Sequence, residues 1–193
     1  HQELRALGVG MVEVTDTVTI PEQMRDVPRI GATFSLAAGF EELAWLGRGP
    51  QENYPDRLRG AAVARWESTV REQYVPYVMP QEHGLHCDTA WIELADSTTT
   101  LRVEALAPRS FAFSALHHSA LDLTAATHAE ALVARPETIV HVDHRHRGLG
   151  TLSCGPDTLE RYKIRPATHR WTWRLIASPD PGHLPPARHG PRS

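Results

Sequence analysis

The sequence predicts an all-β protein, a large antiparallel β-sandwich with at most one short helix. Apolar and polar residues alternate along most of the chain, which is typical of strands with one buried face. The strand-like segments recur roughly every ten to fifteen residues, separated by turn residues, as in β-sandwiches. Only one stretch is predicted to form a helix.

The first predicted strand runs from Val9 to Ile20, where Val12, Val14 and Asp16 share one face. After a polar connector, alternation returns over residues 29–37 and 41–46. Residues 61–77 are less regular and indicate short extended pieces. Residues 85–94 and 98–107 predict a hairpin around Ala95-Asp96-Ser97, because a turn signal separates two apolar runs. Later strands are predicted over residues 111–115, 138–147 and 169–177.

The one predicted helix covers Leu121–Glu130, with Ser119 or Asp122 as its N-cap. We expect residues 1–178 to form a single domain. The remaining residues, 179–193, contain five prolines and two glycines, which predicts a disordered tail or linker. The five tryptophans all lie in apolar strand pattern, so core packing is expected of them before sugar stacking.

The composition argues against several classes of protein. A formal net charge of −3 for 193 residues gives no electrostatic reason to expect nucleic acid or an anionic membrane. Cys87 and Cys154 form no CxxC pair, which argues against a zinc knuckle or a disulfide scaffold. No apolar run reaches the ~20 residues needed to cross a bilayer, and no signal peptide is present. We therefore expect a cytoplasmic protein. The abrupt start at His1-Gln2 indicates a piece of a larger one.

Two histidines offer one possible site. His144 and His146 lie two apart on a predicted strand and should project from the same face, with His141 and Asp143 on the other. Such a pair binds zinc if a third ligand arrives from elsewhere. A hydrophilic sheet face is the commoner explanation, so we expect no metal site here.

Four carboxylates and one thiol offer other possible sites. A glycosidase needs two carboxyl groups flanking a sugar, and Glu52, Asp56, Glu82 and Asp88 lie in or beside loops. Ser153-Cys154 lies between glycines but lacks the strand-to-helix elbow of a serine hydrolase, because Pro156 follows. Bracing carboxylates and a structural corner are the expected roles.

Three loops together resemble one family. Trp45-Leu46-Gly47-Arg48 followed by a first polar loop is similar, nearly residue for residue, to a signature of the C-terminal domain of bacterial β-galactosidases in glycoside hydrolase family 2. This first polar loop consists of Gly49, Pro50, Gln51, Glu52, Asn53, Tyr54, Pro55, Asp56 and Arg57. A second polar loop within Tyr77–Gly84 and a late loop over residues 148–156 are similar to the next two motifs of that domain, in the same order and spacing.

The resemblance implies a fold related to galactose mutarotase, as the last domain of a retaining β-galactosidase, and a chain that starts inside this domain. The catalytic glutamates of the family lie in a separate barrel, so no residue of this chain is expected to be catalytic. A galactoside such as lactose is the implied substrate, and the barrel of the same polypeptide the implied partner. Magnesium and sodium ions are implied mainly elsewhere, so we expect no cofactor in this chain.

The late loop carries the site that the resemblance implies. In the family it offers a tryptophan, or in some members a cysteine, to the sugar pocket, and Cys154 with Ser153 matches the cysteine version. A thiol there would act as a small apolar wall. The first polar loop is then a rigid corner, with Asp56 and Arg57 bracing the turn and Asn53 capping backbone groups.

Some residues depart from the family pattern, and two alternatives stay open. His86-Cys87-Asp88 and His117-His118-Ser119 put a histidine where relatives have other residues. One alternative is a carbohydrate-binding module using Glu82, His83, His86 and Asp88. The other is a mutarotase-like epimerase using a histidine and a glutamate on one concave face. An incomplete sandwich would also leave sheet edges open, which favours a homo-oligomer.

Overall fold

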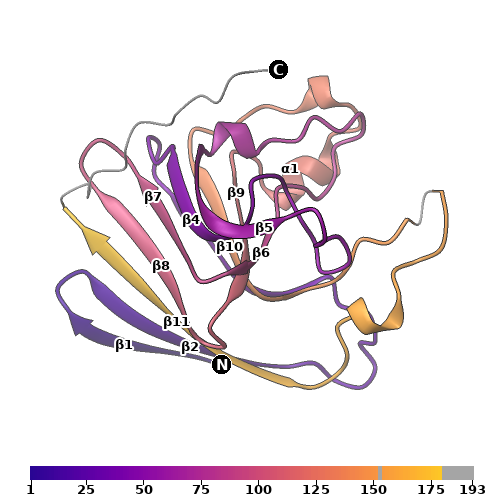
Figure 1. The fold of residues 1–193 in the computed structure, drawn as a ribbon, viewed down its shortest axis with the longest axis horizontal. Coiled ribbons are helices and arrows are strands. Elements are labelled where there is room, and N and C mark those ends of the chain that lie inside the picture. Colours follow the sequence, from indigo (N-terminus) through magenta and orange to yellow (C-terminus); the bar gives the residue numbers. More distant parts are fainter. Residues whose placement is uncertain (152–153, 180–193) are drawn as a thin grey trace.

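Two antiparallel sheets pack face to face in a computed structural model, which describes residues 1–151 and 154–179 (Figure 1). In these residues a seven-stranded sheet has the order β1-β2-β11-β8-β7-β4-β5, and a four-stranded sheet has the order β3-β10-β9-β6. The predicted β-sandwich is confirmed. The strands are β1 (Gln2–Gly8), β2 (Met11–Thr19), β3 (Arg29–Leu36), β4 (Glu42–Gly49), β5 (Ala62–Thr69), β6 (His86–Thr89), β7 (Trp91–Ala95), β8 (Thr100–Ala107), β9 (Phe111–Leu116), β10 (Thr138–His146) and β11 (Thr168–Ser178).

The core lies between the sheets. Alternate side chains of both sheets meet there, and Trp45, Trp171 and Trp173 are buried among them, as the apolar pattern predicts. Asp16 is buried on the same face of β2 as Val14, because Trp173 Nε1 donates a hydrogen bond of 2.8 Å to its carboxylate. Burial of apolar side chains from both sheets is therefore what holds the layers together.

A smaller apolar cluster covers the other face of the four-stranded sheet. Tyr54, Leu85 and Cys87 are its buried members, with Ala112 and Leu149 packed against them. Burial raises the pKa of the Cys87 thiol to about 12, so Cys87 packs as a neutral apolar side chain. The first polar loop thus lies on the sheet and supplies part of its cover.

Three features differ from the sequence predictions. No strand is predicted before Val9, yet β1 pairs with β2 along one edge. Every residue of β1 is exposed, so no buried face imposes an alternating pattern. The predicted strand over residues 85–94 is two strands in different sheets, β6 and β7, separated at Ala90. Asp88, within β6, has a φ of +52°.

The predicted helix is the third. Helix α1 covers only Ala120–Ala125, and Ser119 is its N-cap in a capping box with Asp122. A 3₁₀ turn, η2 (Ala129–Ala131), follows without any buried residue, so nothing extends the apolar face of the helix. Two further 3₁₀ turns are η1 (Arg71–Gln73) and η3 (Glu160–Tyr162). No helix within the described residues has the length and apolar character that crossing a membrane requires. Residues 180–193 of the predicted tail lie outside the described residues.

Candidate functional site

The first polar loop is tied to the sheet by Asn53. The Asn53 Oδ1 atom accepts a hydrogen bond of 2.8 Å from the backbone N–H of Cys87, and the Asn53 N–H donates to the carbonyl of Leu85 at 2.7 Å. Asn53 itself is only 1% exposed. Its side chain therefore satisfies a buried backbone donor that would otherwise be costly.

Glu52 joins the first polar loop to the second. Its carboxylate accepts a hydrogen bond of 2.7 Å from the backbone N–H of Gly84 and another from the Tyr77 hydroxyl. The bond to Glu52, together with burial, raises the pKa of Tyr77 to about 12. The Glu52 carboxylate is thus engaged by donors of the chain itself, which is the arrangement of a structural carboxylate.

Asp56 holds the late loop. One carboxylate oxygen accepts from Leu149 N–H at 3.2 Å, and the other accepts from Gly150 N–H at 2.8 Å and from Thr158 Oγ1 at 3.3 Å. Arg57 Nη2 donates to the Gly150 carbonyl at 2.6 Å. The side chains of Asp56 and Arg57 therefore brace the late loop.

The glycines of the late loop allow this close approach. A Cβ atom on Gly148 would lie 2.8 Å from Asp56 Cγ and 2.5 Å from Thr158 Oγ1. Gly150 has a φ of +66°, and a Cβ there would lie 2.5 Å from the backbone nitrogen of Thr158. Larger residues would push the loop away from Asp56, which explains the need for glycine at both positions.

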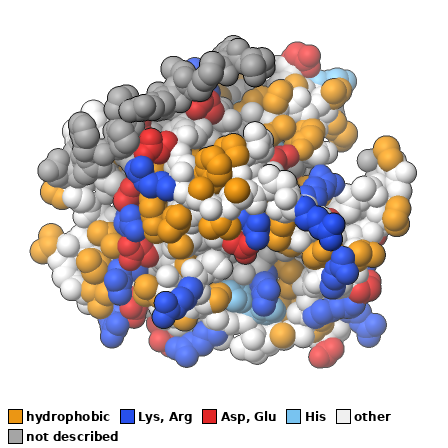
Figure 2. Space-filling model, in the orientation of Figure 1, with side chains coloured by type: hydrophobic (Ala, Val, Ile, Leu, Met, Phe, Trp, Pro, Cys, Tyr) orange, Lys and Arg blue, Asp and Glu red, His pale blue; other side chains and the backbone are white. Residues whose placement is uncertain are grey.

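The tip of the late loop stands away from both sheets, at the right of Figures 1 and 2. Its backbone folds on itself, because Cys154 N–H and Gly155 N–H both donate to the Thr151 carbonyl, at 2.8 and 2.6 Å. Cys154 is exposed there. Ser153, predicted beside it, lies outside the described residues. The structure therefore has an anchored base that carries a projecting tip.

The four residues of the predicted carbohydrate-binding face do not share an open surface. His86 is 1% exposed between Trp45 and Phe113, and its Nε2 atom lies 2.7 Å from Gln73 Oε1. Burial lowers the pKa of His86 to about 4, so the ring is neutral at pH 7. His83 is equally buried, against Tyr74.

The other two of the four are acidic and ion-paired. Asp88 is exposed, with its Oδ2 atom 2.6 Å from Arg48 Nε. Glu82 lies 3.2 Å from Arg29 Nη1 and 3.7 Å from His146 Nε2. Burial alone would raise the pKa of Glu82, but the nearby His146 ring and the charge of Arg29 outweigh it and lower that pKa.

The Arg29–Asp143 pair is the centre of a buried polar cluster that sequence reasoning missed. Arg29 Nε lies 3.2 and 3.1 Å from the two Asp143 oxygens, and Asp143 is 1% exposed. An aspartate at the end of the apolar run Thr138–Val142 was the signal available. The pair joins β3 to β10, and Arg29 also forms an ion pair with Glu82 of the second polar loop.

His144 and His146 do not form the expected pair. The register of β10 against β3 shifts between Asp143 and Arg145, which inserts an extra residue and changes the face of those that follow. His144 stacks on Trp171 with ring centroids 5.1 Å apart, whereas His146 packs against Tyr54. The shared face predicted from their spacing is therefore wrong. Within residues 1–151 and 154–179 no three His, Cys, Asp or Glu side chains are grouped to hold a metal.

A histidine and a glutamate do meet in one cavity, of about 730 Å³, beside η1 and the end of β9. His117 Nε2 lies 2.8 Å from Glu41 Oε2. However, His117 Nδ1 lies 3.0 Å from the Glu137 carbonyl, and Glu41 Oε1 accepts from the backbone N–H of Arg71 at 2.9 Å. Both side chains are thus occupied by structural partners.

The fold and these loops define a β-sandwich module whose polar side chains hold one projecting loop in place. The model of the β-galactosidase small chain family matches residues 4–175. The chain belongs to the β-galactosidase small chain family.

Relatives at the level of whole proteins agree with this assignment. The chain is 37% identical over 159 residues to a β-galactosidase of Vibrio cholerae and 34% identical over 155 residues to one of Arthrobacter sp. strain B7, covering 78% of this chain in each case. It is 35% identical over 167 residues, 84% of this chain, to a β-galactosidase of Aeromonas hydrophila. These matches span only 15%, 15% and 16% of the length of the respective relatives.

Proposed function

We propose that this chain is the C-terminal β-sandwich domain of a retaining β-galactosidase that hydrolyses terminal β-D-galactosides such as lactose. The chain shares its family with β-galactosidases and spans about 15% of their length. Its partner would be a catalytic barrel in the same polypeptide, which supplies the two glutamates and a covalent galactosyl intermediate. Any magnesium or sodium ion of the enzyme would bind outside this chain.

The chain's own contribution would be a wall of the sugar pocket. The supporting observation is that Asp56 clamps Leu149 and Gly150 while Cys154 lies exposed on the tip they carry. A clamped base would hold the tip in one position against a neighbouring domain. Less conformational entropy would then be lost when the sugar binds. The Cys154 thiol would present a small apolar surface to the sugar, with Ser153 beside it.

The test is Cys154→Trp in the full-length enzyme. An indole covers more of a sugar face than a thiol does, so the galactose inhibition constant should change by about threefold or more, which corresponds to ~0.7 kcal/mol. Leu121→Trp adds the same ring at an exposed position of α1 (79% exposed) and should leave the constant unchanged. An unaltered constant in the Cys154 variant would remove the loop from the pocket.

A second assay addresses the chain by itself. The 193-residue chain, purified from a host without β-galactosidase, should not turn over a chromogenic β-galactoside. Turnover at enzyme-like rates would contradict a non-catalytic role. Calorimetry with galactose in the same preparation tests the carbohydrate-binding alternative, which needs measurable heat at millimolar sugar.

A further inference from the structure

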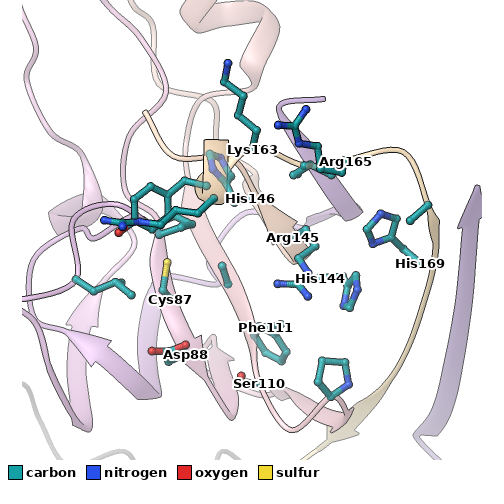
Figure 3. Close-up of a pocket in the computed structure, with 18 residues that line it drawn as sticks. Cys87, Asp88, Ser110, Phe111, His144, Arg145, His146, Lys163, Arg165 and His169 are labelled. Atoms are coloured by element: carbon teal, nitrogen blue, oxygen red, sulfur yellow. The ribbon is translucent and has the colours of Figure 1, made fainter. Parts of the chain in front are cut away.

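A cavity of about 650 Å³ opens beside the base of the late loop, and the described residues give it a basic lining. It lies where β6, the start of β9, the end of β10 and the segment from η3 to β11 meet (Figure 3). Its volume is within the range of small-molecule sites. No step proposed above uses it.

Four side chains with permanent positive charge line this cavity: Arg145, Arg161, Lys163 and Arg165. Asp88 is the one carboxylate among the described lining residues, and Arg48 already neutralises it. The whole chain carries a net charge of −3, so the excess of cations is local. Figure 2 likewise shows Lys and Arg side chains gathered at the right and lower edge of the molecule, near the late loop.

These cations differ in how far the chain satisfies them. Lys163 Nζ lies 3.0 Å from both Asp157 and Glu160, and Arg165 also pairs with Glu160. Arg161 packs over the Tyr162 ring. Arg145, by contrast, has no carboxylate partner in the described part of the chain, and Figure 3 shows it among the labelled residues at the middle of the cavity. Its guanidinium has five N–H donors available.

A pair of histidines forms the opposite wall. His144 Nδ1 and His169 Nε2 are buried nitrogen atoms without a hydrogen-bond partner among the described residues, and the two rings are 5.7 Å apart. Burial, with the charge of Arg145 close by, lowers the pKa of His144 to about 4. These two atoms have almost no solvent-accessible surface, so the rings close this wall of the cavity, and the Arg145 guanidinium is the exposed donor group that an anion would meet.

We propose that this cavity binds a phosphate-class oxyanion, either free or as the phosphate or sulfate group of a small ligand. Arg145 would bind it through two N–H groups, because the planar guanidinium matches two oxygens of a tetrahedral anion. Figure 3 shows Arg145 beside His144, whereas the side chains of Lys163 and Arg165 extend away from Arg145, so they would add positive charge near the anion without touching it. This site is distinct from the sugar pocket wall and does not depend on galactosidase activity.

The experiment is a calorimetric titration of the full-length polypeptide with inorganic phosphate at pH 7, with chloride at matched ionic strength as the reference. We expect one saturable site per chain with a dissociation constant at or below the millimolar range. Arg145→Gln should raise that constant at least tenfold. Arg145 is exposed, so the exchange should leave the fold intact.

A matched control is available on β11. Arg170 is also exposed, has the same charge, and alternates with His169 and Trp171, so its side chain leaves the opposite face of the strand. Arg170→Gln should leave the phosphate constant within twofold of the original. Equal loss in both variants would indicate nonspecific charge attraction and overturn the site.

Thermal unfolding provides a second, independent measurement of phosphate binding. Phosphate at ten times its dissociation constant should raise the melting temperature of the original polypeptide and not that of the Arg145 variant. Absence of both heat and thermal shift in the full-length polypeptide would overturn the proposal, and would mean that another part of the same polypeptide fills the cavity. Galactosidase turnover measured alongside reports separately on the proposed function.

Discussion

Asp56 connects the first polar loop to the late loop. Its carboxylate binds the backbone of Leu149 and Gly150, which lie 93 and 94 positions later in the chain. A local reading of the first polar loop assigns its polar side chains to their own turn. The structure shows instead that several of them bind elsewhere: Asn53 at Cys87, Glu52 at Gly84, and Asp56 in the late loop. The dense polar composition of this loop is therefore explained by its position between three segments.

Replacing Asp56 by alanine should release the late loop. Two backbone N–H groups and the Thr158 hydroxyl would lose a charged acceptor, and hydrogen bonds of this kind are worth about 1.5–3 kcal/mol. We expect urea denaturation to show a loss of about 2 kcal/mol, and limited proteolysis to cut the late loop faster. Glu22→Gln changes an exposed carboxylate outside both loops, so it is the control and should change neither measurement. Unchanged stability together with unchanged cleavage in the Asp56 variant would contradict the clamp.

Individual strands show where the alternation of apolar and polar residues predicts the structure correctly and where it does not. The alternation in β2 identifies its buried face, because one face of a half-buried strand contacts the core and the other contacts water. Strand β1 has no such signal, because all its residues are exposed. In β10, one extra residue at the bulge places His146 beside Glu82, although the spacing alone assigns it to the side of His144.

Helix α1 offers a test at this scale. Ser119 Oγ accepts from Asp122 N–H at 3.2 Å, and the Asp122 carboxylate accepts from Ser119 N–H at 2.8 Å. Removing an N-cap hydroxyl costs about 0.5–2 kcal/mol, so Ser119→Ala should lower the free energy of unfolding by about 1 kcal/mol. Ser97→Ala, in an exposed turn, should stay within ~0.5 kcal/mol of the original in the same urea series. Equal effects from the two changes would argue against the capping box.

At the scale of the whole molecule, stability should depend on pH through buried neutral histidines. The pKa of His86, His141 and His144 is lowered to about 4, chiefly by burial. Between pH 6.5 and 4 the unfolded chain takes up protons at these rings and the folded chain does not. The folded state therefore loses stability as pH falls through this window.

The expected size follows from His86, the most buried of the three. A pKa lowered from 6.5 to about 4 corresponds to about 3 kcal/mol over the window, at roughly 1.4 kcal/mol per pH unit. Urea midpoints should change little above about pH 7 and fall as the pH is lowered through 6.5 towards 5, and His86→Gln should reduce the slope. His128→Gln, at an exposed position, should not reduce it. If the urea midpoint of the original chain did not change between pH 7 and 5, the folded state would not be keeping these rings buried and uncharged.

The open edges of the two sheets also belong to this scale. Strands β1 and β5 end the larger sheet, and β3 and β6 end the smaller one, within the residues that the structure describes. Exposed edges favour pairing with another strand. Self-association of the isolated chain remains a prediction from these edges.

The sequence by itself determined the sandwich, most strand positions and the family, and it limited the N-cap of α1 to Ser119 or Asp122, since all of these depend on local patterns and on motifs read in order. Only the tertiary structure decided what the polar residues bind. His83 and His86 are buried in packed surroundings, and the Asp56 carboxylate lies at the late loop. The cavity that contains Arg145 joins five separate segments. The physical reason is that hydrogen bonds and ion pairs form between atoms within about 3–4 Å in space, and pairing between strands brings together residues that are far apart in the chain.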